Sequence, residues 1–420
     1  MQALTVSLSL VVALAASQAM KFWLAGRQAR SVQAHRGAVP APFDATIPLS
    51  AHQRAADYTL ARLRFGMTTE TVGAVLLLAW TLLGGLDALN ALVRDALQPR
   101  FGDMVYQLGL FAAFALIGGL IDLPLEWVRV FRIEQRFGFN RMTPKLFFTD
   151  LAKGTALSIA IGLPMMAAVL WVMRATGEFW WLWVWALWVG FILLMQVVYP
   201  IWIAPWFNRF EPLADSAMAE RVQALMARCG FTAKGLFVMD GSTRSSHVNA
   251  YFGGIGKAKR VVLFDTLLAR LGGREVEAVL AHELGHFHHK HVLVMTLRSF
   301  GVGLLAMALL GWLARQPAFF VGLGVEPNLQ AANDALALLL FMLVAPPFLF
   351  FTSPLSARWS RRAEFEADAY ARAQTDGADL ASALLKLHED NGSTLTPDPV
   401  YARFYYSHPP ASERLAALQA

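Results

Sequence analysis

The segment Trp180–Val198 reads WWLWVWALWVGFILLMQVV and contains no Asp, Glu, Lys or Arg. A membrane-spanning helix needs about 20 mostly apolar residues, because each residue adds about 1.5 Å across a hydrocarbon core about 30 Å thick. We therefore predict that a helix at 178–203 crosses a membrane. The chain of 420 residues is 56% hydrophobic and 16% charged, against about 45–50% and about 25% in soluble domains. This composition excludes a soluble protein.

Six further stretches are long and apolar enough to span, with approximate edges. The first could instead be a signal peptide, but it has no positive charge before its apolar run, and Lys21, Arg27 and Arg30 all follow it. We therefore expect it to be an uncleaved span. The predicted spans are 2–23, 69–92, 104–128, 154–174, 178–203, 292–314 and 334–353.

The distribution of positive charge orients these seven spans. Most of the 36 Lys and Arg residues fall in segments on one side of the membrane, and few fall on the other. Because short loops rich in Lys and Arg stay in the cytoplasm, we predict an N-terminus outside and a C-terminus inside. The segments rich in positive charge are 24–68, 129–153, 204–291 and 354–420, and the opposite side carries Arg94, Arg100, Arg174 and Arg315.

Two long polar segments lie on the same side in this arrangement, where together they can form one compact domain. The predicted fold class is an all-α multi-pass membrane protein with a mainly α-helical cytoplasmic domain that contains a small β element. The predicted parts are spans one to five in 1–203, a first catalytic segment in 204–291, spans six and seven in 292–353 and a second catalytic segment in 354–420.

Local patterns predict the elements of the polar segments. The helix that precedes the sixth span is expected to run into that span without a break, and the last of these helices is expected to leave the seventh span. The expected helices are 214–229, 273–291 and 356–374, and the expected strands are 235–239 and 260–264.

Some functional classes are excluded at this point. Cys229 is the only cysteine, so the chain has neither an internal disulfide nor a cysteine-based zinc site. We find no module of interleaved basic and aromatic residues and no Gly-rich phosphate loop. Nucleic acid is therefore not an expected partner, and the net charge of +6 is better explained by membrane orientation.

The most informative motif is Ala281-His-Glu-Leu-Gly-His286. Two histidines four residues apart face the same side of a helix, so His282 and His286 can both bind one zinc ion. Glu283, beside the first histidine, can then take a proton from the water on that ion. Other nearby histidines form no pair at this spacing and are expected to be polar surface residues without a metal: His288, His289 and His291.

A catalytic zinc site needs a third protein ligand and one open position. Glu364 and Asp368 are four residues apart on a predicted helix and share one face, whereas Glu366 points about 200° away. One carboxylate could bind zinc while the other orients a ligating imidazole through its second N–H. The alternative is a charged helix face with surface ion pairs, and spacing alone does not decide between the two.

Several further motifs accompany the HELGH core in a fixed order. They are Ile133-Glu-Gln-Arg-Phe-Gly-Phe-Asn140, Asn249-Ala-Tyr-Phe-Gly253, Val262-Leu-Phe-Asp-Thr-Leu-Leu268, Glu364-Phe-Glu-Ala-Asp368, Ser407-His-Pro-Pro410 and Glu413-Arg414. With these motifs in register, the chain resembles the type I CAAX prenyl protease family of membrane zinc metalloproteases over most of its length.

The resemblance implies a ring of seven helices around a large intramembrane chamber, with the metal near its cytoplasmic end. It implies one zinc ion per chain, with His282, His286 and Glu364 as ligands. Glu283 is then the general base or acid, and Asp368 supports a ligand instead of binding the metal.

Three further roles follow from the resemblance. Asn249 matches a family position that holds the substrate backbone. His408 and Arg414 match residues placed to contact the substrate carbonyl or to stabilise charge at the reacting centre. One extra donor to a tetrahedral oxyanion contributes about 3 kcal/mol in other oxyanion holes. Without the resemblance, His408 would be a loop residue and Arg414 a surface charge.

The predicted function is that of an integral membrane zinc endopeptidase acting on a peptide or protein, with prenylated C-termini as the family substrates. A second hypothesis keeps the chemistry but makes non-prenylated or misfolded membrane proteins the clients. A third is a transporter or channel with a structural zinc. A structural zinc is usually bound by four protein ligands, and a site of that kind would leave Glu283 without a role.

The location is predicted from composition and loops. The chain is rich in Ala, Leu and Arg, the loop between spans six and seven is short and weakly charged, and the sequence ends without a KDEL-type signal. These features indicate a bacterial inner (plasma) membrane, with the catalytic segments in the cytoplasm. Because bacteria generally do not prenylate their own proteins, the family activity need not be the physiological one.

Overall fold

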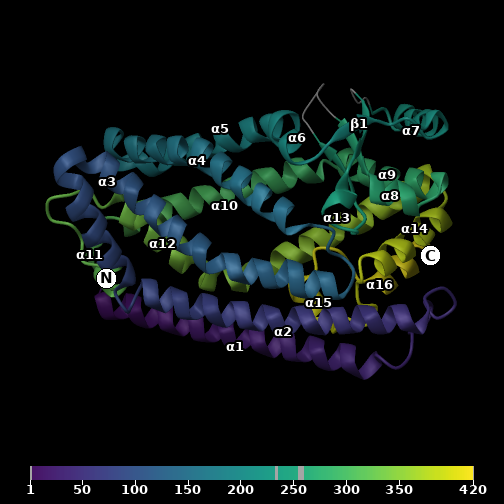
Figure 1. The fold of residues 1–420 in the computed structure, drawn as a ribbon, viewed down its shortest axis with the longest axis horizontal. Coiled ribbons are helices and arrows are strands. Elements are labelled where there is room, and N and C mark those ends of the chain that lie inside the picture. The colour runs from purple at the N-terminus through teal and green to yellow at the C-terminus, as the bar shows by residue number, and fades with distance from the viewer. Residues whose placement is uncertain (1, 232–234, 254–259, 420) are drawn as a thin grey trace.

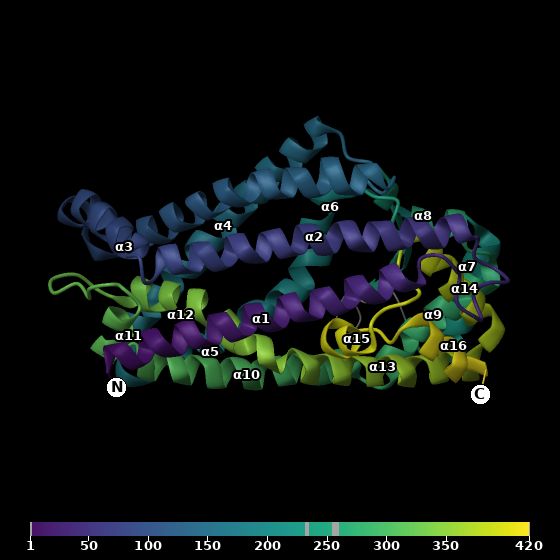
Figure 2. The ribbon, with the colours of Figure 1, turned by 90° about the horizontal axis from the view of Figure 1, so that it is seen from below.

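The chain is mostly helical, in a computed structural model that describes residues 2–231, 235–253 and 260–419 (Figure 1). Long helices run along the long axis of the molecule, and short helices and strands gather at one end (Figures 1 and 2). The long helices are α1 (Ala3–His35), α2 (Leu49–Trp80), α3 (Gly85–Val128), α4 (Pro144–Ala175), α5 (Trp180–Val198), α10 (His291–Leu313), α12 (Asp334–Leu349) and α13 (Ser353–Gln374).

Six helical stretches in the described part of the chain are long and apolar enough to cross a membrane. Large apolar side chains such as Leu116, Trp202 and Leu305 are exposed on them. A surface of this kind suits lipid, because large exposed apolar areas are unusual on soluble proteins. The multi-pass prediction is thus confirmed. The six stretches are Ala3–His35, Gly85–Glu134, Pro144–Ala175, Gly177–Phe207, His291–Leu313 and Asp334–Gln374.

The predicted span at 69–92 is wrong, because the helix is interrupted within that range. α2 ends at Trp80 and α3 begins at Gly85. Between them, Gly84 has a φ of 77°, in the left-handed region that glycine adopts readily because it lacks a Cβ. α2 begins much earlier than the predicted span, at Leu49, and lies beside α1 (Figure 2). It lies next to α1, where the second span was expected, although it is not among the six stretches above.

A hydrophobic core holds the long helices together toward the end of the molecule where the N-terminus lies (Figure 1). Leu10 of α1, Leu110 of α3, Leu170 of α4, Leu310 of α10 and Leu340 of α12 are all buried in it. At the opposite end the long helices meet the polar segments. The packing of the long helices therefore determines where the polar segments, and the site within them, lie.

A small mixed sheet and several helices form that opposite end (Figure 1). The strand order is β1-β2-β4-β3, with β2 and β4 parallel and the other two pairs antiparallel. Both predicted strands are confirmed within a residue. The strands are β1 (Phe210–Pro212), β2 (Leu236–Met239), β3 (Ala250–Gly253) and β4 (Arg260–Phe264), and the helices are α7 (Ser216–Arg228), α8 (Asp265–Arg270), α9 (Gly273–His288), α14 (Gly377–Asp390), α15 (Pro399–Tyr405) and α16 (Ala411–Gln419).

Residues from both polar segments share one hydrophobic core. Val261 of β4 and Leu280 of α9 come from the first segment, and Ala371 of α13 and Leu380 of α14 come from the second; all four are buried. Segments separated by two membrane helices therefore fold against each other.

The connections differ at the two places where this core meets the membrane helices. α13 follows α12 through the short turn Phe350–Thr352, as predicted. α9 does not continue into α10, because it ends at His288 and Lys290 adopts a φ of 56°. The expected unbroken helix to residue 291 is therefore wrong. The remaining short helical segments are Arg129–Glu134, Gly177–Phe179, Tyr199–Ile203, Ala204–Phe207, Gly241–Thr243 and Pro317–Gly322.

Candidate metal centre

α9 and α13 lie close together because the α9 residue that faces α13 is a glycine, Gly285, which has no side chain. A Cβ added to Gly285 would lie 2.9 Å from Cα of Ala367 and 3.1 Å from its carbonyl oxygen, well inside the usual carbon contact distance of about 3.5–4.0 Å. Gly285 is the glycine of HELGH. The motif therefore supplies two histidines and also the space for the second helix.

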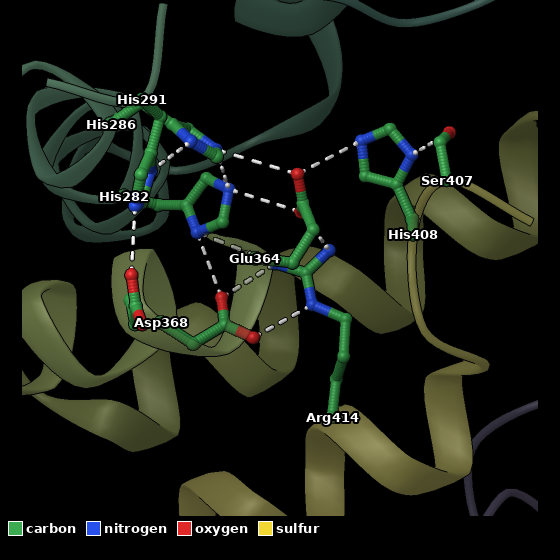
Figure 3. A network of polar contacts seen from close by, with 9 residues as sticks. His282, His286, His291, Glu364, Asp368, Ser407, His408 and Arg414 are labelled. Carbon is green, nitrogen blue, oxygen red and sulfur yellow. Dashed lines mark hydrogen bonds and ion pairs between the residues drawn. The ribbon is translucent and has the colours of Figure 1, made fainter. Parts of the chain in front are cut away.

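This approach places His282 and His286 of α9 opposite Glu364 of α13 (Figure 3). The two Nε2 atoms are 3.3 Å apart. His282 Nε2 is 3.5 Å from Glu364 Oε2, and His286 Nε2 is 3.4 Å from Glu364 Oε1. One ligand atom from each of the three residues lies within 4.8 Å of the others. The structure thus brings together the three residues that the sequence predicts as ligands.

The donor set fits a metal ion. Glu364 Oε2 is buried and accepts no hydrogen bond from the described residues, and two imidazole nitrogens point at each other. Leaving such buried groups without a partner is costly. Although burial favours the neutral imidazole, the carboxylates of Asp368 and Glu364 raise the pKa of His282 to about 9. The site therefore attracts positive charge, whether a proton or a metal ion.

Asp368 lies behind His282, on the face of α13 that it shares with Glu364 (Figure 3). Its Oδ1 is 2.8 Å from His282 Nδ1, so the Nδ1–H donates to the carboxylate and Nε2 is directed at Glu364. Arg414 of α16 donates to the same carboxylate from Nε at 2.8 Å and from Nη2 at 2.6 Å. Arg414 and Asp368 are both buried. Asp368 thus lies within hydrogen-bond distance of one predicted ligand, and Arg414 is held against it.

His408 lies on the other side of Glu364 (Figure 3). Its Nε2 is 3.4 Å from Glu364 Oε1, and its side chain is 66% exposed. The opposite ring nitrogen, Nδ1, is 3.0 Å from Ser407 Oγ. His408 is therefore close to the cluster and still accessible from solvent.

A cavity of about 790 Å³ opens onto this cluster. Asn249, Glu283 and His408 line it at the cluster, and Lys21 of α1 and Met67 of α2 line it from the membrane helices. Burial raises the pKa of the Glu283 carboxyl, which is the direction that would suit the predicted role of general base. All the residues that the sequence predicts for the site therefore either join the cluster or face this cavity.

One contact in this cluster was not predictable from the sequence pattern. His288 and His289 are exposed, as expected, but His291 is buried, and its Nδ1 lies 3.0 Å from His286 Nδ1. In an unbroken helix His291 would lie about 140° around the axis from His286. Helical periodicity therefore could not place the two side chains together.

Comparison with known proteins identifies the family. A family model described as "CAAX prenyl protease N-terminal, five membrane helices" matches residues 28–209, and one described as "Peptidase family M48" matches residues 212–420. The chain belongs to peptidase family M48. The M48 match contains both the HELGH motif and the Glu364 helix, so the family assignment and the geometry concern the same residues.

Named relatives of this M48 peptidase support the assignment. The CAAX prenyl protease 1 homolog of Arabidopsis thaliana is 37% identical over 78% of this chain and 77% of the relative. CAAX prenyl protease 1 of Saccharomyces cerevisiae is 36% identical over 79% and 76%. The crystal structure of S. mikatae Ste24p matches with a TM-score of 0.92 at 28% identity, covering 99% of both chains. The chain is therefore a multi-pass membrane metalloendopeptidase of the CAAX prenyl protease group, and the transporter hypothesis has no support.

Proposed function

We propose that this peptidase uses zinc to cleave near the carboxyl end of a membrane-anchored, prenylated substrate. The observation that carries the proposal is the cluster of buried His282, half-buried His286 and buried Glu364, which opens onto a cavity shared with α1 and α2. A site on a free-standing soluble domain would not share its cavity with membrane helices.

The choice of zinc rests on the donor set. Two imidazole nitrogens and one carboxylate beside an accessible cavity are typical of catalytic zinc sites. His282, His286 and Glu364 would hold the ion, and Asp368 would fix the tautomer of His282. Bound zinc supplies Lewis acidity toward a water molecule and the scissile carbonyl.

The surrounding residues have separate tasks in this proposal. The Glu283 carboxylate takes a proton from the attacking water and delivers it to the leaving amine. His408 and Arg414 donate hydrogen bonds toward the oxygen of the scissile carbonyl as it gains negative charge. Asn249, which lines the same cavity, binds the extended substrate backbone.

The proposed substrate class follows from where the cavity lies. A lipid chain on the substrate could bind between the membrane helices, and each buried CH₂ contributes about 0.8 kcal/mol. The name of two relatives, CAAX prenyl protease 1, points to the same class. The second hypothesis, clients without a prenyl group, differs only in this anchor.

The test compares two peptides of identical sequence, one prenylated and one not, with the purified full-length protein. We expect a higher kcat/KM for the prenylated peptide and no cleavage by Glu283→Gln, which should still contain zinc by elemental analysis. Equal kcat/KM values for the two peptides would show that the prenyl group does not contribute to recognition, and would favour non-prenylated clients. A Glu283→Gln protein that loses its zinc, or cleaves at the wild-type rate, would contradict the role of Glu283 as base.

We also propose the orientation predicted from the charges, with the N-terminus outside and the metal centre in the cytoplasm. The bias of Lys and Arg toward the polar segments supports it. The inner membrane of a bacterium is the proposed location.

A further inference from the structure

The turn between α9 and α10 places the side chain of His291 next to Nδ1 of His286, a proposed zinc ligand. Lys290 adopts a φ of 56°, an uncommon conformation for a residue other than glycine. Directly after it, the His291 ring lies 5.1 Å from the His286 ring, centroid to centroid, at an interplanar angle of 69°. The two Nδ1 atoms are 3.0 Å apart, at hydrogen-bond distance. Backbone strain held in this way often accompanies a functional constraint.

A second hydrogen bond continues from the far side of His291. Its Nε2 is 2.9 Å from Oε2 of Glu366, and the other Glu366 oxygen accepts a bond of 3.0 Å from Arg362 Nε. Glu366 lies on α13 two residues after Glu364 but faces another direction. The three side chains form a chain from the surface to the cluster: Glu366, His291 and His286.

The proton positions in this chain are determined by simple hydrogen-bond rules. An ionised Glu366 only accepts, so the proton between it and His291 lies on His291 Nε2. The Nδ1 atom of a neutral His291 is then an acceptor, and His286 donates to it from Nδ1. The Nε2 lone pair of His286 is thereby left free and faces Glu364. This is the tautomer that a zinc ligand needs.

We propose that His291 and Glu366 are positioning residues that hold His286 in its zinc-binding tautomer and orientation. The inference rests on the proposed zinc site. His282 is supported directly by a buried carboxylate, Asp368, whereas His286 is supported through an intervening imidazole by Glu366, whose side chain is 38% exposed. The two ligands are therefore held by arrangements of different length and different accessibility.

A competing interpretation comes from the same neighbourhood. His289, His291 and Glu366 also offer ligand atoms within 4.8 Å of one another, so they could hold a second cation. In the described structure both ring nitrogens of His291 already have partners, which favours the hydrogen-bonded chain. The experiment below separates the two, because the second-cation interpretation predicts two zinc ions per chain.

The test measures zinc affinity of the purified full-length protein by competition with a chromophoric chelator, and the visible spectrum after Co²⁺ substitution. His291→Phe and Glu366→Ala should weaken zinc binding by about 10–100-fold, as is typical when a supporting partner of a ligand is lost, and should alter the Co²⁺ bands. Glu366→Gln keeps an acceptor for His291 Nε2–H, so it should recover much of the affinity. A purely structural role would not be rescued in this way.

Two controls complete the design. His289→Ala removes a neighbouring exposed histidine and should leave one zinc per chain with unchanged affinity. Glu364→Ala should empty the site, which tests the proposed centre separately. If Glu364→Ala loses zinc while both His291→Phe and Glu366→Ala bind it as tightly as the wild type, the positioning role is refuted and the zinc site stands. If zinc binding falls from two ions to one in His289→Ala, the second-cation interpretation replaces the proposal.

Discussion

Arg414 and Asp368 form a pair in which each group depends on the other. Both are buried, and two parallel hydrogen bonds join the guanidinium to the carboxylate. Removing one partner of such a pair typically costs about 3–5 kcal/mol, because the other charge stays buried and uncompensated. Arg414 Nη1 is also 3.6 Å from Glu364 Oε2. The pair thus links α16 to the support of His282 and to a proposed ligand.

Replacing Arg414 with lysine keeps the charge but removes the planar fork that matches a carboxylate. We expect Arg414→Lys to lower kcat by about 100-fold or more, the usual loss for one donor to a developing oxyanion, with a smaller change in KM. Steady-state kinetics, with zinc content measured on the same samples, will check this. A rise in KM at unchanged kcat would instead place Arg414 in ground-state binding.

Glu275 gives a prediction about pH. Burial alone would raise its pKa, but hydrogen bonds from Lys386, Ser382 and the Gly272 N–H outweigh burial and lower the pKa below its ordinary 4.5. A carboxyl with a lowered pKa stabilises the fold above its unfolded pKa, and that stability disappears as the pH falls through the folded value. The Tm difference between wild type and Glu275→Gln should therefore be largest near pH 7 and shrink below pH 4.5. A difference independent of pH would contradict this.

At the scale of elements, the distance between α9 and α13 determines whether the proposed ligands on the two helices can bind one ion. Any side chain at Gly285 would contact the α13 backbone at Ala367. We expect Gly285→Ala to push the helices apart, to cost about 1–3 kcal/mol as overpacking does, and to weaken zinc binding. Thermal unfolding and chelator competition measure these two effects.

Gly118 of α3 is the matched control, since apart from the adjoining turns of its own helix no described atom lies within 4 Å of the Cβ that alanine would add there. Gly118→Ala should be neutral or slightly stabilising, because alanine favours helix. Equal effects at both positions would mean that helix propensity, and not the approach of α13, explains the loss.

Elements with a regular period were predictable, and their interruptions were not. The i,i+4 rule correctly placed His282 with His286 and Glu364 with Asp368, because each pair lies on one continuous helix. Hydropathy and helical periodicity failed at Thr81–Gly84 and at Lys290, where the backbone leaves the helical conformation and ends a helix that the surrounding sequence would extend. The position of His291 depends on the second of these breaks. The chemical roles of the site residues stay predictions.

At the scale of the whole molecule, the cavity was beyond any pattern in the sequence. Its walls include Lys21 of α1, Met67 of α2 and His408, which only the complete fold brings together. Composition predicted a membrane protein and charge predicted an orientation, but neither describes a space between helices. That expectation came from the family resemblance alone.

Orientation can be tested with cysteines introduced at the two ends of the molecule after Cys229 is replaced. Leu329 is 99% exposed in the loop before α12, and Ala373 is exposed near the end of α13. We expect Leu329→Cys to react with a membrane-impermeant thiol reagent added to intact cells, and Ala373→Cys to react only after permeabilisation. The reverse labelling pattern would overturn the proposed orientation.

The contact between Arg414 and His282 also has a consequence for the timing of biosynthesis. The two residues are separated by 132 positions. At about 5–20 residues per second, the ribosome needs roughly 7–26 s to travel from one to the other. Throughout that interval the HELGH helix exists without Arg414, and for the first part of it also without Glu364 and Asp368. All six apolar stretches end before Arg414 in the sequence, so the ribosome has synthesised every one of them before the proposed centre can be complete.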